Sequence, residues 1–215
     1  MTVANNQAEW SVLLIGGSTG VGKTLAARKL AQHLSISLLL VDDVRIALQQ
    51  VTTPADHPDL HIFPNYQPAQ WAKSEIIRDD WIAVGKALLG PLKAIIQHHV
   101  VIPSAGQIII EGDGVLPALS KLSSFEEKEA FTNAKKNREV RAVFIVEDDK
   151  EQLLRNLRMR GRGFQNWEPP EQEDFTQASW LFGQWLTQEA RNLNLPVIAA
   201  QPHEMLPERI LATTR

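Results

Sequence analysis

Residues 16–24 read Gly-Gly-Ser-Thr-Gly-Val-Gly-Lys-Thr and follow directly on the apolar run Ser-Val-Leu-Leu-Ile at 11–15. Behind them, residues 22–34 carry apolar side chains at helical spacing. An apolar run, a glycine-rich turn and then a helical segment predict a strand, a tight connection and a helix. Because glycine has no side chain, such a turn lets a ligand come close to the backbone N–H groups.

The same stretch matches the pattern G-x-x-x-x-G-K-[ST] from residue 17 onward, in the strand–turn–helix context that the pattern requires. Inward-pointing N–H groups and the partial positive charge at the helix start favour a polyphosphate. Lys23 is predicted to reach the β- and γ-phosphates, and the Thr24 hydroxyl to bind the accompanying Mg²⁺. The predicted nucleotide-binding residues are Gly17, Ser18, Thr19, Gly20, Val21, Gly22, Lys23 and Thr24. A glycine-rich turn that binds nothing is the alternative.

Outward from this stretch, short apolar runs alternate with longer segments of helical periodicity, which predicts an α/β fold with helices on both faces of a parallel sheet. Continuous apolar runs such as residues 38–41 favour strands buried on both faces. Five strands are predicted, at 11–15, 37–41, 107–111, 140–146 and 196–200. Helices are predicted at 22–34, 43–50, 70–98 with a break at Gly90-Pro91, 125–137, 150–160 and 175–192.

Two stretches have no helical or strand pattern, residues 52–68 with four prolines and residues 161–173 with Pro169-Pro170. Long loops in a compact domain are usually functional, so we expect both to border a ligand. We expect one domain over residues 1–215, with an acceptor-binding segment at about 44–100 and a lid at about 155–173.

The composition excludes several classes of function. The chain has 215 residues, a net charge of −3 and no cysteine. It therefore has no overall positive field for nucleic acid or an anionic membrane, and no disulfide or thiolate chemistry. Residues 1–7 lack the basic and apolar regions of a signal peptide, and no apolar run is long enough to span a bilayer. We expect a cytoplasmic protein, monomeric or homodimeric, with no nucleic-acid or membrane partner.

Acidic residues at strand ends are the candidates for chemistry on the phosphate, since ligands of open α/β sheets collect at the carboxyl ends of the strands. Asp42 ends the second predicted strand and is expected to orient, or take the proton of, an attacking hydroxyl. Alternatively, Asp42 or Asp43 is the N-cap of the next helix. Glu111 and Asp113 follow the third strand and are expected at the site, although Glu-Gly-Asp-Gly is also plausible turn chemistry.

Four arginines, Arg155, Arg158, Arg160 and Arg162, crowd the end of the helix after the fourth strand. Not all of them can face one way on a helix. Arg160 and Arg162 lie on either side of Gly161 and are expected to close over the phosphates and stabilise transition-state charge.

These segments resemble the small-molecule and nucleotide kinases of the phosphate-loop class, most closely the 2-phosphoglycerate kinase-like proteins. The resemblance rests on residues 16–24, on Leu-Val-Asp-Asp-Val-Arg at 40–45, on residues 109–117 and on Arg160-Gly161-Arg162. It implies the P-loop NTPase fold with a small lid, ATP and Mg²⁺ at Lys23 and Thr24, the acceptor at Asp42 and Arg45, and Glu111 near the metal or the acceptor. Asp43 stands where such kinases tend to carry a small residue, and residues 52–68 have no counterpart.

The sequence thus predicts an ATP-dependent kinase that transfers the γ-phosphate to a hydroxyl of a small, anionic metabolite. Lys23, Asp42, Arg160 and Arg162 are its predicted catalytic residues. Asp42, Arg45, Glu111 and Asp113 are predicted to bind the acceptor, and Thr24 and Glu111 to bind the metal. The rival hypothesis is an ATP-binding regulatory or assembly NTPase without a small-molecule acceptor.

Overall fold

The first strand, β1, is the middle strand of a five-stranded sheet in the computed structural model of this protein, which describes residues 10–63, 73–123, 139–161 and 163–214. The strand order is β2-β3-β1-β4-β5, and every neighbouring pair is parallel. The predicted α/β class and the five-stranded parallel sheet are confirmed, and each strand overlaps its predicted range. The strands are β1 (Trp10–Gly17), β2 (Ser37–Leu40), β3 (Ile108–Glu111), β4 (Glu139–Val146) and β5 (Val197–Ala199).

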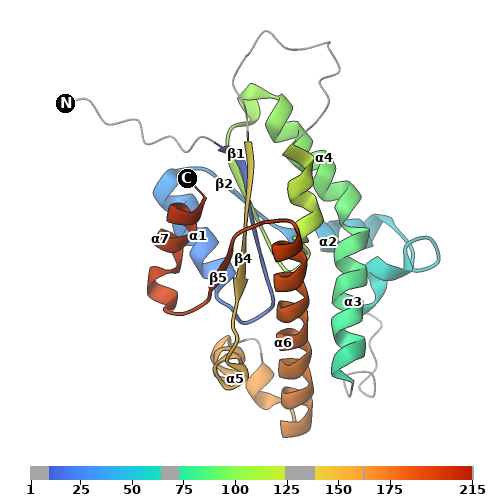
Figure 1. The fold of residues 1–215 in the computed structure, drawn as a ribbon. Helices are drawn as coiled ribbons and strands as arrows, with labels where there is room; N and C mark the ends of the chain where they lie inside the picture. Colours follow the sequence, from blue (N-terminus) through green and yellow to red (C-terminus); the bar gives the residue numbers. More distant parts are fainter. Residues whose placement is uncertain (1–9, 64–72, 124–138, 162, 215) are drawn as a thin grey trace.

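Helices connect the strands and cover both faces of the sheet (Figure 1). They are α1 (Lys23–Leu34), α2 (Val41–Val51), α3 (Ser74–Ala87), α4 (Leu89–Val101), α5 (Lys150–Met159), α6 (Pro169–Asn192) and α7 (Leu206–Thr213). Single turns of 3₁₀ helix are η1 (Pro58–His61), η4 (Pro103–Ala105), η6 (Phe164–Asn166) and η7 (His203–Met205), and a longer one is η5 (Pro117–Ser123).

Alternation along β1 assigns its side chains to two separate cores. Val12 and Leu14 pack into the cluster beneath α3, α4 and α6, whereas Leu13 and Ile15 pack into the cluster beneath α1, α5 and α7. All four are fully buried, as expected for a central strand covered on both faces. In Figure 1 the two helix layers lie on opposite sides of the sheet, with α1 and α7 on the left and α3, α4 and α6 on the right.

The sheet register brings the glycine-rich stretch next to the acidic end of β3. Leu14 is opposite Ile110, and Ile15 is opposite Glu111. From β1 the chain continues to β2, at one edge of the sheet. From the neighbouring β4 it continues to β5, at the opposite edge. Connections that diverge in this way leave a crevice at the carboxyl edge of the sheet, where ligands of open α/β folds bind.

The start of α2 differs from the prediction. The second strand ends at Leu40, and Val41 is already the first helical residue, with Leu40 as the N-cap. Asp42 and Asp43 therefore lie in the first helical turn, where carboxylates interact favourably with the helix dipole. Neither is the N-cap, so the capping alternative is wrong for both.

The break in the long helical region lies between Ala87 and Leu89, before Gly90-Pro91. Pro91 falls in the first turn of α4, where its missing N–H removes no intrahelical bond. The sequence pattern located a break correctly but placed it on the wrong side of the helix start.

The proline pair at 169–170 starts a helix, so the loop predicted at 161–173 ends sooner than expected. Both prolines lie at the first two positions of α6, and Glu168 and Glu171 form a capping box around its N-terminus. Proline is suited to the first turn because its φ is already helical. The helix α7 was not predicted. The helix expected at 125–137 lies outside the described residues.

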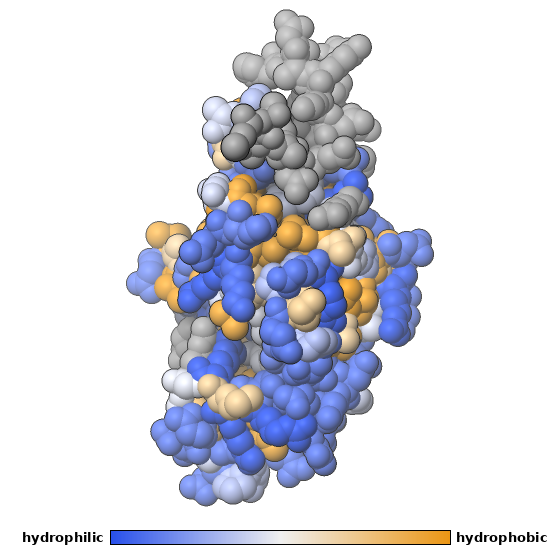
Figure 2. Space-filling model, turned by 90° about the vertical axis from the view of Figure 1, so that its left-hand side faces the viewer, coloured by the Kyte–Doolittle hydropathy of each residue, from blue (hydrophilic) through white to orange (hydrophobic). Residues whose placement is uncertain are grey.

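The face formed by α1 and α7 is mainly hydrophilic, with hydrophobic residues in a broken band across its middle (Figure 2). Among the residues that the structure describes, no helix combines the length and apolar character needed to cross a membrane.

Candidate functional site

The glycine-rich turn, residues 17–24, joins the central strand β1 to α1 and has a backbone that only glycine adopts easily. Gly20 and Gly22 have φ values of 88° and 84°, in the left-handed region that is unfavourable for other residues. A Cβ on Gly20 would lie 2.9 Å from Leu153 Cδ1, and one on Gly22 would lie 3.3 Å from the His203 ring. The absence of side chains at these positions is therefore required by conformation and by packing.

The first turn of α1 points its N–H groups toward the glycine-rich turn. Gly22 is the N-cap, and within the described chain no side chain caps these groups. Uncapped N–H groups at a helix start carry a partial positive charge and bind anions. A backbone of this shape can enclose a phosphate chain.

Lys23 lies at the first position of α1, and its side chain is almost fully buried. Its Nζ donates to the Ser18 carbonyl at 3.0 Å, forms an ion pair with Asp113 Oδ1 and lies 4.0 Å from Glu111 Oε1. Asp113 Oδ1 is buried and accepts no hydrogen bond from the described residues, and the ammonium group compensates its charge. The cation predicted to hold phosphate thus sits between two carboxylates.

Thr24 and Glu111 are joined directly, since Thr24 Oγ1 donates to Glu111 Oε1 at 3.2 Å. Burial raises the pKa of the Glu111 carboxyl, and the charges of Asp113 and Asp42 add to this; the Lys23 ammonium and the Thr24 hydrogen bond act in the opposite direction. A buried carboxylate whose charged form is disfavoured gains from a nearby cation.

The oxygen donors at this site fit only one mode of Mg²⁺ binding. In the described chain, no cluster of three or more His, Cys, Asp or Glu side chains could hold a metal ion alone. Mg²⁺ commonly uses one or two protein oxygens together with substrate phosphates and water. Thr24 Oγ1 and the Glu111 carboxylate suit that mode of binding, so a metal here depends on a phosphate ligand.

Two side chains that the sequence did not indicate hold the glycine-rich turn from outside. Asn156 Nδ2, on α5, donates to the Gly20 carbonyl at 3.0 Å, and Ser179 Oγ, on α6, donates to the Thr19 carbonyl at 2.9 Å. Ser179 is completely buried. Both bonds satisfy backbone carbonyl oxygens of the turn and so fix its shape. No motif marks either residue, because each is an ordinary polar position inside a helix.

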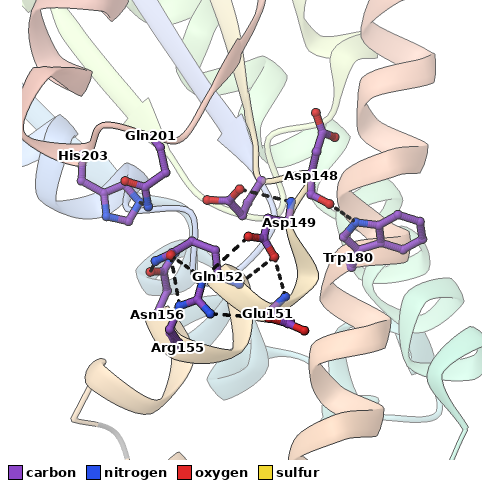
Figure 3. A network of polar contacts seen from close by, with 10 residues as sticks. Asp148, Asp149, Glu151, Gln152, Arg155, Asn156, Trp180, Gln201 and His203 are labelled. Carbon is purple, nitrogen blue, oxygen red and sulfur yellow. Dashed lines mark hydrogen bonds and ion pairs between the residues drawn. The ribbon is translucent and has the colours of Figure 1, made fainter.

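The arginines of the predicted lid divide into different roles. Arg160 Nη1 contacts Thr19 Oγ1 in the glycine-rich turn. Arg158 Nε donates to Gln172 Oε1 at 2.8 Å, which ties α5 to α6. Arg155 is half exposed and bonds to Gln152 on its own helix, beside the N-capping Asp149 (Figure 3). Arg162 lies outside the described residues.

A pocket of about 260 Å³ opens beside the glycine-rich turn. Its lining is partly polar and partly apolar. The polar lining consists of Thr19, Asp42, Arg45, Asp113 and Arg160, and the apolar lining of Val41, Phe63, Trp81, Val84, Leu88 and Phe175, together with Gly114. Phe63 comes from the predicted loop at 52–68 and Arg160 from the predicted lid at about 155–173, whereas no described residue of the stretch 161–173 lines the pocket.

Asp42 and Arg45 lie one turn apart on α2, at the pocket. Arg45 Nη2 is 3.6 Å from Asp42 Oδ1, and the Asp42 side chain is 61% exposed. Asp42 thus lies not in the strand but in the first turn of α2, where its exposed carboxylate is accessible from the pocket. Asp113 differs, because its Oδ1 is already paired with Lys23.

The structure therefore brings together most of the predicted site residues. Lys23, Thr24, Glu111 and Asp113 form one connected polar cluster, and Asp42, Arg45 and Arg160 line the pocket next to it. Arg155 and Arg158 make their contacts elsewhere. The three aromatic residues of the pocket were not predicted as site residues, since rings at helical spacing are also typical of a core.

No family model matches the sequence, and no curated protein resembles it closely enough to count as a relative. Among solved structures, the chain is similar to an uncharacterized protein from Eubacterium ventriosum ATCC 27560. The TM-score is 0.41 at 15% sequence identity, over 94% of this chain and 96% of that one. A similarity of that size carries no information about activity.

Proposed function

We propose that this protein is a P-loop kinase that transfers the γ-phosphoryl group of ATP to a hydroxyl of a small metabolite. One juxtaposition carries the proposal: the glycine-rich turn, with Lys23 and Thr24 at the start of α1, adjoins a pocket lined by Asp42, Arg45 and Arg160. A nucleotide-binding turn alone is compatible with many functions. A separate pocket beside it, with its own acid and cations, favours a second substrate.

On the nucleotide side, the residues fit a magnesium-bound triphosphate. The left-handed glycines leave room for phosphate oxygens, and the uncapped N-terminus of α1 supplies N–H donors. Lys23 would exchange its contact with Asp113 for the β- and γ-phosphates, and Thr24 with Glu111 would hold Mg²⁺. The bound metal would also relieve the unfavourable burial of the Glu111 charge.

On the acceptor side, Asp42 is the carboxylate best placed to contact a hydroxyl. Its side chain is exposed to the pocket, whereas those of Glu111 and Asp113 are engaged by Thr24 and Lys23. The acceptor oxygen would form the new P–O bond as the bond to ADP breaks, and its proton would pass to Asp42. Arg160, which already contacts the turn, would stabilise charge on the transferred group.

The test is ADP formation from Mg²⁺-ATP by the full chain, with and without a panel of hydroxylated metabolites. A kinase releases ADP faster when one metabolite is present. A regulatory or assembly NTPase binds ATP but hydrolyses it at a rate that no metabolite changes, and that result would overturn the proposal.

Asp42→Asn sharpens the test because it removes the proton acceptor and keeps the shape. We expect kcat to fall by about 10²- to 10⁴-fold while the affinity for ATP stays nearly constant. Asp43→Asn is the matched control, since Asp43 shares the first turn of α2 but does not line the pocket. Equal losses in the two variants would contradict the role of Asp42.

A further inference from the structure

The pocket beside the glycine-rich turn is more apolar than a compact polar acceptor needs. Its lining includes an aromatic wall of three rings that lie close together, Phe63, Trp81 and Phe175, as well as Val84 and Leu88. All three rings are only partly buried. A small hydroxy acid with no apolar body would make no apolar contact with this wall, whereas a ligand that buries apolar surface against it gains free energy.

Trp81 is held in place by rings from other elements. Its ring centroid is 5.3 Å from that of Phe175 in an edge-on arrangement, 5.8 Å from that of Phe182 and 6.3 Å from that of Phe63. Phe182 is buried in the core beneath α6. The aromatic wall is thus a preformed surface backed by the core, because aromatic contacts at these separations restrain ring orientation.

The size of the pocket limits what can cover the wall. An engineered apolar cavity of about 150 Å³ accepts benzene, so about 260 Å³ holds a single ring with a short polar arm. Among the polar lining residues, Arg45 and Arg160 are the cations, and Arg45 Nη2 is 3.6 Å from Asp42 Oδ1. A guanidinium group in such a position binds a carboxylate or another planar anion well.

We propose, on the basis of the kinase function above, that the acceptor is an aromatic hydroxy acid: one ring, a hydroxyl and a single anionic group. The ring lies against Trp81 and Phe175, the anion lies at Arg45, and the hydroxyl faces Asp42. This acceptor class is narrower than the small, anionic metabolite that the sequence predicts, because it also requires a ring.

Binding to the full chain is measured by calorimetry with three matched probes, in the presence of Mg²⁺ and a non-hydrolysable ATP analogue. 3-Phenyllactate carries all three groups, lactate lacks the ring, and 1-phenylpropan-2-ol has a methyl group in place of the carboxylate. We expect 3-phenyllactate to bind about tenfold to a hundredfold more tightly than lactate, because it buries the ring. Equal affinities for 3-phenyllactate and lactate would overturn the proposal.

Variants assign the two preferences to their residues. Trp81→Ala should abolish the preference for 3-phenyllactate over lactate, and Trp81→Phe should keep most of it. Phe63→Ala provides a second variant at the edge of the wall in case Trp81→Ala does not fold. Arg45→Gln should abolish the preference for 3-phenyllactate over 1-phenylpropan-2-ol and leave the ring preference intact. A ring preference that survives both Trp81→Ala and Phe63→Ala contradicts the assignment.

Failure of this inference and failure of the kinase function give different results. If glycerate or another compact hydroxy acid stimulates ADP formation and ring-bearing acids do not, the kinase function stands and the acceptor class is wrong. If no acceptor stimulates ADP formation, the kinase function fails, and the ring preference is still measured by binding alone.

Discussion

Glu111 carries a charge that the folded protein disfavours. Its pKa is raised above the ordinary 4.5, first of all by burial. Between 4.5 and the raised value, the folded state holds more protons than the unfolded state, so stability falls as pH rises through this window. In Mg²⁺-free buffer, we expect Glu111→Gln to be more stable than the wild type near pH 7, with a difference that shrinks as pH falls toward 4.5. Urea unfolding midpoints at several pH values measure this.

Glu151→Gln is the control for that experiment, because its side chain is 87% exposed. A Glu111→Gln variant that is less stable than the wild type near pH 7, with a loss that shrinks as pH falls, would show instead that the charged Glu111 is a net stabilising partner of Lys23. The trade is typical of a binding site, where a group placed for a ligand lowers the stability of the free protein.

The sequence predicted some residues of the candidate site and missed others. Lys23, Thr24, Glu111 and Asp113 were predicted as site residues and do lie together, since strand ends and the phosphate-binding pattern locate them. Asn156, Ser179 and Trp81 were not predicted. They lie on other helices and reach the turn or the pocket only in the folded protein, so no motif or spacing in the sequence marks them. Which of the lid arginines turns toward Thr19 likewise depends on where α5 ends.

Among the elements, the connection between β1 and α1 is the one most dependent on glycine. Gly20→Ala would need a left-handed residue with a Cβ 2.9 Å from Leu153. We expect it to destabilise the fold by about 1–3 kcal/mol. Gly90→Ala is the matched control, since Gly90 is in the first turn of α4 and its Cβ would meet no atom within 4 Å apart from its two chain neighbours. The helix propensity of Ala and the following Pro91 act in opposite directions, so we expect a change of about 1 kcal/mol or less. Thermal unfolding of both variants decides this, and equal effects would contradict it.

Helix starts explain most of the errors in the predicted elements. Proline was interpreted as a loop residue at 169–170 and as a break at 91, whereas in both places it lies in the first turn of a helix. Proline is common both in loops and in the first turn of a helix. The neighbouring residues that distinguish the two, such as Glu168 and Glu171 of the capping box, are recognised as a cap only once the helix start is known. The strands were easier to predict because the sheet is buried on both faces.

For the whole molecule, the glycine-rich turn is where separate elements meet. β1, β3, α5 and α6 all place a side chain or a strand end against it. A ligand bound there should therefore stabilise the entire fold. At a Mg²⁺-ATP concentration about a hundredfold above the dissociation constant, we expect a rise in melting temperature of roughly 5–10 °C.

Lys23→Ala should lose most of that shift, and Lys29→Ala, an exposed lysine on the same helix, should keep it. Differential scanning calorimetry measures both. A wild-type melting temperature that Mg²⁺-ATP leaves unchanged would contradict nucleotide binding at the turn.

One helix touches both halves of the site. On α6, Phe175 lines the pocket and Ser179, one helical turn further on, holds the Thr19 carbonyl. Residues at this spacing lie on the same face of a helix. A ring bound against Phe175 and a phosphate bound at the glycine-rich turn would therefore both act on α6. We expect the two proposed substrates to alter each other's affinity, and thermodynamic reciprocity requires each to change the affinity of the other by the same factor.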